Sequence, residues 1–220
     1  MQRVGVILGS SATGPRAELL TAVEALGAVA IQRHAGGDSY RLPHRIDHAA
    51  NLRFLLDAGC ESALGVCSVG SLREEIGVGD LICPDDFISL QEGGLTTFED
   101  ARAHQPPGFD RAWRGRVLAV AGEVDGEELR DGGVYWQATG PRFETPAEIG
   151  LIASHADVVG MTMASECVIA GELGIPYAAI CAVDNLANGV GPGPLSVAGM
   201  EAVRDRNAER LRAALEGVLR

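Results

Sequence analysis

The sequence VVGMTMASECVIAGELGIPYAAICAV, at residues 158–183, contains two short apolar runs with a longer segment between them. The runs at 158–160 and 177–183 consist mainly of small or β-branched residues, which are typical of buried strands. The residues at 165–173 between them have the spacing of a helix. The pattern therefore predicts a strand, a helix and a second strand, which is the repeating unit of an α/β sheet.

The same alternation continues along the rest of the chain. Further strands are predicted at 4–8, 28–32, 63–67, 81–83 and 134–138, and further helices at 15–26, 48–58, 146–155 and from 196 onward. No internal repeat and no long linker interrupts this order. We therefore predict a single α/β domain over residues 1–220, with a mixed, largely parallel central sheet flanked by helices.

Composition narrows the functional class. The chain has 220 residues, of which 46% are hydrophobic and 22% charged, as in ordinary soluble proteins. Its net charge of −12 argues against nucleic acid and against an anionic membrane surface as partners. The five cysteines are odd in number and form no C-x-x-C pair, so we expect buried free thiols in a reducing cytosol. The first apolar run is too short for a signal peptide or a membrane span, and we expect a cytoplasmic protein.

Two strand ends carry groups suited to an anion. Gly9 and Ser10 follow the first strand, where glycine lets the backbone approach an anion and free amides and a hydroxyl bind its oxygens. The alternative interpretation of Gly9 and Ser10 is a turn between a strand and a helix that binds no ligand. Arg33 ends the second strand, beside His34, and offers a bidentate fork for phosphate.

Three later segments carry groups suited to a purine nucleoside. The first, ATGPRFET at 138–145, supplies the flat ring of Phe143 and the carboxylate of Glu144, which can accept from a base N–H. Arg142 could pair with Glu144 instead. The second, GMT at 160–162, supplies Met161 and Thr162. A methionine is adaptable enough to lie beneath a ribose, although a methionine in an apolar strand is usually a core residue.

The third of these segments is VDNLANG at 183–189. Together with GS at 9–10, RH at 33–34, CSVGSLREE at 67–75 and GMT at 160–162, these segments resemble the trimeric purine nucleoside phosphorylase and methylthioadenosine phosphorylase family. The resemblance extends from Val4 to about Gly189, and the chain is shorter than typical members. It implies the nucleoside phosphorylase fold and a pentosyltransferase activity.

The resemblance also implies roles for individual residues. Asn185 would donate to N7 of the leaving base, Glu144 would fix the base, and Phe143 and Met161 would contact base and ribose. The phosphate-binding residues would be Ser10, Arg33, His34, Ser68 and Thr162, and Ser68 would also line the sugar. Glu166 would help to hold the site. No cofactor or metal is implied, because orthophosphate is the co-substrate.

Other residues depart from the family or match it poorly. Asp184 replaces the usual threonine or serine, so either it reads the base after a one-residue shift of the alignment or it supports the site from behind. A second phosphate-side histidine is missing, and His44 and His48 are either its substitutes or structural histidines. His104 lies in the irregular stretch 92–111 and resembles the histidine that methylthioadenosine phosphorylases lend to a neighbouring subunit, or it is a solvated loop residue. The family expectation is a homotrimer.

The predicted reaction is phosphorolysis of a purine nucleoside to the free base and ribose 1-phosphate. An ionised Glu144 accepts the N1 hydrogen of a 6-oxopurine but repels the N1 lone pair of adenine, which favours inosine, guanosine or 5′-methylthioinosine. The alternatives are a 5′-methylthioadenosine phosphorylase that reads adenine through Asp184, a nucleosidase that uses water, and a non-catalytic relative.

Overall fold

The computed structural model describes residues 2–9, 17–34, 40–90, 94–107, 109–121, 129–191, 193, 195 and 197–220. Nine strands form one sheet: β1 Val4–Leu8, β2 Val29–Gln32, β3 Ser62–Ser71, β4 Leu81–Cys83, β5 Asp86–Ser89, β6 Arg130–Asp131, β7 Val134–Gln137, β8 Val158–Gly160 and β9 Tyr177–Leu186. The helices are α1 Ala17–Ala25, α2 His48–Asp57, α3 Arg111–Ala121, α4 Pro146–Ile152, α5 Met163–Leu173 and α6 Val197–Leu219, with short 3₁₀ turns η3 Pro43–Arg45 and η4 Ala101–Ala103.

The sheet is mixed and largely parallel, as predicted. Its path runs β5-β7-β8-β3-β9-β4-β6, and β1 joins β2 to the first half of β3. The pairs β3–β8 and β4–β9 are antiparallel, whereas the other described pairs are parallel. The long central strands β3 and β9 lie side by side and carry the candidate site near their carboxyl ends.

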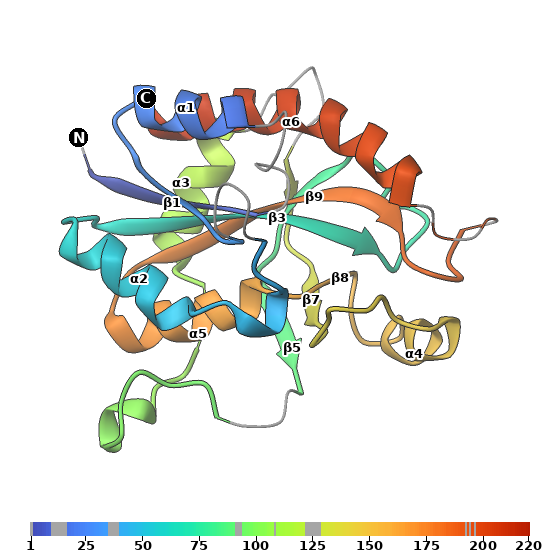
Figure 1. Cartoon of the computed structure of the whole chain (residues 1–220), viewed down its shortest axis with the longest axis horizontal. Helices are drawn as coiled ribbons and strands as arrows, with labels where there is room; N and C mark the ends of the chain where they lie inside the picture. The colour runs from blue at the N-terminus through green and yellow to red at the C-terminus, as the bar shows by residue number, and fades with distance from the viewer. Residues whose placement is uncertain are drawn as a thin grey trace.

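Helices cover both faces of this sheet (Figure 1). One core packs α1, α3 and α6 against the sheet through residues such as Val23, Val117 and Leu211. The other packs α2 and α5 on the opposite face through residues such as Leu55 and Ile169. A third, smaller cluster lies under α4 at the far end of the sheet. Since strands β3 and β9 are apolar on both faces, their nearly continuous burial follows from this two-sided cover.

Most predicted elements are confirmed with small changes at their ends. The strand predicted at 177–183 extends through Leu186, so Asp184 and Asn185 lie on β9 rather than in a loop. Residues 94–107 contain only η4, in agreement with the predicted irregular stretch. Helix α3 and strand β5 were not predicted. In α3 only Trp113, Val117 and Ala121 are buried, and arginines and Gly115 between them obscure the helical pattern.

Candidate functional site

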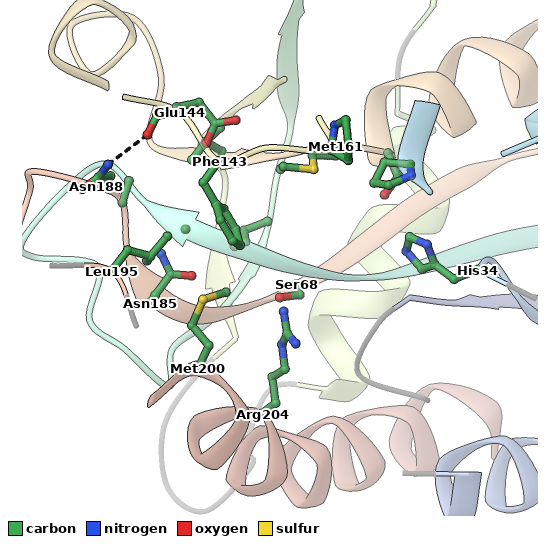
Figure 2. A pocket seen from close by; sticks show the side chains of 18 of the residues that line it. His34, Ser68, Phe143, Glu144, Met161, Asn185, Asn188, Leu195, Met200 and Arg204 are labelled. Carbon is green, nitrogen blue, oxygen red and sulfur yellow. Dashed lines mark hydrogen bonds between the residues drawn. The ribbon is translucent and has the colours of Figure 1, made fainter. Parts of the chain in front are cut away.

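A cavity of about 380 Å³ lies at the carboxyl ends of β3 and β9, beside α6 and the segment that precedes α4. Eight of the predicted site residues line it: Arg33, His34, Ser68, Phe143, Glu144, Met161, Thr162 and Asn185. They come from β3, from β9 and from the loops that follow β2, β7 and β8, so the fold brings together residues that are far apart in the sequence. Figure 2 labels His34, Ser68, Phe143, Glu144, Met161 and Asn185 around the cavity.

Phe143 and Glu144 are held at one end of the cavity by the start of α4. Thr145 is the N-cap of this helix. Its hydroxyl accepts from the backbone amide of Glu148, and the Glu148 carboxylate accepts from the backbone amide of Thr145, which together form a capping box. Pro146 follows in the first turn. The Phe143 ring is 43% exposed, which leaves its face available to a planar ligand.

The Glu144 carboxylate stays available because Arg142 has another partner. Arg142 donates from both Nη atoms to the Glu148 carboxylate, at 2.7 and 2.8 Å, and not to Glu144. Partial burial raises the pKa of Glu144 above its ordinary value, and the nearby Glu148 adds to this. The backbone carbonyl of Glu144 accepts from Asn188 Nδ2 at 3.1 Å, which ties this segment to the loop after β9 (Figure 2).

Asp184 and Asn185 face different surroundings because β9 carries one extra residue. Val69 pairs with Val183 and Gly70 pairs with Asn185, so the register shifts at Asp184, as in a β-bulge. Asn185 faces the cavity, and its Nδ2 donates to the carbonyl of Leu186 at 2.8 Å. A Cβ atom at Gly70 would lie 3.1 Å from that nitrogen, so glycine lets the carboxamide lie close to β3.

Asp184 lies behind the wall of the cavity and is 2% exposed. Its carboxylate accepts from the Ser68 hydroxyl, from Arg204 Nε at 3.1 Å and from Asn207 Nδ2 at 2.7 Å. This arrangement agrees with the interpretation of Asp184 as a supporting group rather than as the group that reads the base.

Arg33 is buried and its guanidinium is already occupied. Its Nε and Nη2 donate to both oxygens of Glu166, the latter at 2.9 Å, and its Nη1 donates to the carbonyl of Val66 at 3.1 Å. Burial alone would lower the pKa of Arg33, but the Glu166 carboxylate keeps it well above its usual value. The Arg33 guanidinium, which the sequence analysis assigned to phosphate, therefore binds the Glu166 carboxylate instead.

The ion pair of Arg33 and Glu166 supports the end of β1. Glu166 also accepts from the Tyr177 hydroxyl at 2.7 Å, so it joins β2, α5 and β9. A Cβ atom at Gly9 would lie 2.4 Å from Arg33 Nη1, which means that the backbone after β1 packs directly on the guanidinium. Ser10, the predicted phosphate ligand that follows Gly9, lies outside the described residues.

Met161 and Thr162 lie where β8 passes into α5. The Tyr135 hydroxyl accepts from the backbone amides of Thr162 at 3.2 Å and Met163 at 3.4 Å, which fixes the start of the helix. A Cβ atom at Gly140 would lie 2.6 Å from the Met161 sulfur, so this glycine allows the loop before α4 to close over Met161. Met161 is therefore a wall residue of the cavity rather than part of the core.

The histidines separate into different surroundings. His34 lines the cavity, stacks on Tyr40 with ring centroids 5.0 Å apart, and has its Nδ1 2.8 Å from the Arg41 carbonyl. Burial lowers its pKa, with a further contribution from Arg33. His48 is buried beside Glu166, and burial lowers its pKa to about 4, so it is a structural histidine. His44 is exposed on η3.

His104 is exposed, and it lies away from the cavity of its own chain. Its loop packs against the carboxyl-terminal end of α5, where Glu172 accepts from the Thr97 amide at 2.7 Å. The cavity lies at the other end of α5, about 16 Å away for a helix of this length. Within one chain, His104 therefore does not join the other predicted residues.

The wall also contains residues that the sequence analysis did not assign to the site, among them Asn188, Met200 and Arg204. Met200 and Arg204 lie on α6, where the sequence analysis predicted a helix from residue 196 onward but assigned no site residue. The spacing of α6 contained no signal for Arg204, because its partner Asp184 becomes a neighbour only in the folded chain.

Two further properties bear on the chemistry of the site. Within the described part of the chain, no cluster of three or more His, Cys, Asp or Glu side chains could hold a metal ion. Among the same residues, no helix combines the length and the apolar character needed to cross a membrane.

Comparison with known proteins identifies relatives over most of the sequence. The profile of the phosphorylase superfamily matches residues 11–220. A protein of Archaeoglobus fulgidus named "Probable 6-oxopurine nucleoside phosphorylase" is 45% identical over 168 residues, which cover 76% of this chain and 68% of that protein. A protein of Methanothermobacter thermautotrophicus named "Probable S-methyl-5′-thioinosine phosphorylase" is 34% identical over 191 residues, covering 86% of this chain and 67% of that one.

The fold is also found among solved structures. Methylthioadenosine phosphorylase from Schistosoma mansoni, in complex with adenine, superimposes with a TM-score of 0.85 at 22% identity. The match covers 100% of this chain and 91% of that structure. At this identity the likeness concerns the fold, and it confirms the architecture predicted from the sequence.

Proposed function

This chain belongs to the phosphorylase superfamily, and we propose that it cleaves the N-glycosidic bond of a 6-oxopurine nucleoside with orthophosphate. The products are the free base and a pentose 1-phosphate. Inosine, guanosine and 5′-methylthioinosine are the candidate substrates, in keeping with the names of the two relatives.

The observation that carries this proposal is the convergence of Phe143, Glu144 and Asn185 on one cavity. The ring offers a face to the purine, the Glu144 carboxylate accepts its N1 hydrogen, and the Asn185 amide donates to N7. Because Arg142 pairs with Glu148, it leaves the Glu144 carboxylate to the ligand. The adenine alternative relied on Asp184 as the group that reads the base, but Asp184 is held by Ser68, Arg204 and Asn207.

Phosphate is proposed to bind beside Thr162, His34 and the backbone amide of Ser68, together with Ser10. Thr162 and His34 line the same cavity as the base-binding residues. We assign Arg33 to positioning rather than to direct contact, since its donors are taken by Glu166 and by backbone carbonyls.

Catalysis in this proposal is positioning combined with fixed electrostatics. As the glycosidic bond breaks, the sugar becomes positive and the departing purine becomes negative. The bound phosphate faces the sugar cation, and the Asn185 amide stabilises the negative charge at N7. The proposed reaction uses orthophosphate as co-substrate and needs no cofactor, no metal and no covalent nucleophile.

The working assembly is proposed to be a cytoplasmic homotrimer in which His104 completes a neighbour's sugar pocket. The exposure of His104 and its distance from its own cavity suit a role in a neighbouring subunit. The free, buried cysteines suit a reducing compartment.

The test is product release from matched nucleosides with and without phosphate. We expect phosphate-dependent release of hypoxanthine from inosine, at a higher kcat/KM than that for release of adenine from adenosine. Equal rates without phosphate would identify a nucleosidase. Faster release of adenine would return the base-reading role to Asp184, and binding of hypoxanthine without turnover would identify a non-catalytic relative.

A further inference from the structure

The loop after β9 packs against the start of α4, beside the residues assigned to the purine. Asn188 is partly buried, and its Nδ2 donates to the backbone carbonyl of Glu144 at 3.1 Å (Figure 2). Gly189 has a φ of +91°, and a Cβ atom there would lie 3.0 Å from Pro146 Cβ. The loop and the beginning of α4 are therefore in direct contact.

The hydrogen bond from Asn188 acts on a segment with little regular structure of its own. Residues 138–145, all of which the structure describes, lie outside helices and strands. The helix that follows does not need Asn188 as a cap, because Thr145 and Glu148 already form its capping box. What Asn188 holds in place is the backbone at Glu144.

The direction of the Glu144 carboxylate depends on that backbone. The carboxylate accepts from the amide of its own residue, which opposes the rise in its pKa caused by burial. A change in the backbone at Glu144 would therefore turn the carboxylate and alter its exposure to water. Because Asn188 fixes the carbonyl of the same residue, it restrains the backbone from which the carboxylate projects.

The segment that carries Asn188 also carries the donor assigned to N7. Asn185 precedes Asn188 by three residues. The Ala187 amide between them donates to the Ser71 carbonyl at 2.8 Å, which fixes the segment to β3. A purine is rigid and presents N1 and N7 on different rings, so the groups that read these atoms must keep a fixed separation. Asn188 connects those two groups, the Glu144 carboxylate and the Asn185 amide.

We propose that Asn188 is a positioning residue for base selection, which holds the Glu144 carboxylate at the N1 edge of a 6-oxopurine while Asn185 meets N7. This role rests on the proposed function, and Asn188 itself does not touch the base. Without its hydrogen bond the carboxylate loses its fixed position, and the preference for a base with a hydrogen at N1 weakens. Adenine has a lone pair at N1 and gains nothing from that position.

Steady-state kinetics at saturating phosphate compare inosine with adenosine, which lacks the N1 hydrogen. Asn188→Ala should lower kcat/KM for inosine about tenfold, mainly through a higher KM, because a hydrogen bond that orients a charged group has an effect of about that size. The value for adenosine should not fall. Asn188→Asp keeps the shape of the side chain without the amide hydrogen, so it should lose at least as much with inosine. Asn51→Ala is the control, since Asn51 is a carboxamide on α2 away from the cavity.

The acidic limb of the pH profile separates positioning from a general loss of structure. In the wild-type protein its midpoint reports the raised pKa of Glu144. In Asn188→Ala the released carboxylate is more exposed to water, so the midpoint should move down toward the ordinary glutamate pKa of 4.5. A purely structural role would lower the melting temperature and kcat/KM for both nucleosides while leaving the midpoint in place.

Circular dichroism and thermal melting establish whether each variant is folded. A wild-type ratio of inosine to adenosine kcat/KM in folded Asn188→Ala overturns the proposal, and so does an unmoved midpoint. If Asn188→Ala does not fold, the same ratio in Asn188→Asp decides. Phosphate-independent turnover would disprove the proposed function alone, since the ratio of the two nucleosides would still test Asn188.

Discussion

At the scale of single residues, the site depends on which way neighbouring side chains face. The sequence analysis identified most of the cavity wall, including Phe143, Glu144 and Asn185, because these residues occur in recognisable segments. It could not identify the partner of Arg33, because Glu166 is 133 residues away in the chain. An arginine at a strand end has the same sequence pattern whether it binds phosphate or a buried carboxylate.

The Asn185 amide is expected to act in the chemical step. Asn185→Ala should lower kcat/KM for inosine by about 100-fold, because a single preorganised donor to a developing negative charge has an effect of that size. Steady-state kinetics measure the change. Asn51→Ala is the control, since Asn51 is a carboxamide on α2 away from the cavity. A variant of Asn185 with nearly normal turnover would contradict the assignment.

The raised pKa of Glu144 predicts the acidic limb of the pH profile. Only the ionised carboxylate accepts the N1 hydrogen, so kcat/KM for inosine should fall as the pH drops through the Glu144 pKa. Because burial raises that pKa, the midpoint should lie above the ordinary glutamate value of 4.5. Glu144→Gln should remove this limb and lower kcat/KM at neutral pH. A limb that persists in Glu144→Gln would have to come from another group.

His48 predicts a pH dependence of stability rather than of activity. Its pKa is about 4 in the folded chain and 6.5 as an ordinary value. Between these pH values the unfolded chain binds a proton that the folded chain does not, so stability falls as the pH falls from about 6.5 to 4. The loss is on the order of 3 kcal/mol in the free energy of unfolding. Denaturant titrations at several pH values measure it, and His48→Gln should flatten the dependence over this range.

At the scale of elements, periodicity predicted the strands and helices that are strongly apolar on one or both faces. β4 and β8 have the predicted bounds, and α5 begins within two residues of the prediction. Elements that bury little were harder to find. β5 has no fully buried residue, and only three residues of α3 are buried. Their formation depends on neighbours such as β7 and α6 that the local sequence does not show.

Helix α5 is expected to depend on Glu166 for its attachment to the sheet. Glu166→Gln would leave the buried Arg33 without its counter-charge and should lower the free energy of unfolding by about 3–5 kcal/mol. Chemical denaturation measures the loss. Glu172→Gln, on the same helix but partly exposed, should cost much less. Equal losses in the two variants would show that the ion pair has no special role.

At the scale of the whole molecule, helix α5 separates the cavity from the loop that contains His104. The cavity is at its amino-terminal end and the loop with His104 is at its carboxyl-terminal end. Near the cavity, Leu90 and Leu151 are 75% and 68% exposed and line a second hollow that shares Glu144 with the first. Large exposed apolar side chains of this kind are typical of surfaces that a partner covers.

The proposed assembly predicts a mass in solution of about three times the 23.0 kDa of one chain. Light scattering after size exclusion measures this mass. Leu151→Glu should favour smaller species and lower the specific activity, and His104→Ala should raise the KM for the nucleoside without changing the mass. A monomer with full activity at the assay concentration would contradict both expectations.

The extra residue of β9 has an evolutionary consequence. Successive side chains of a strand alternate between its faces, so the identity of the group that meets the purine depends on how many residues separate Val183 from Leu186. Removing one residue there would turn Asn185 toward α6 and its partners. A change in length at this point, without any new side chain, would therefore be enough to change which bases the enzyme accepts.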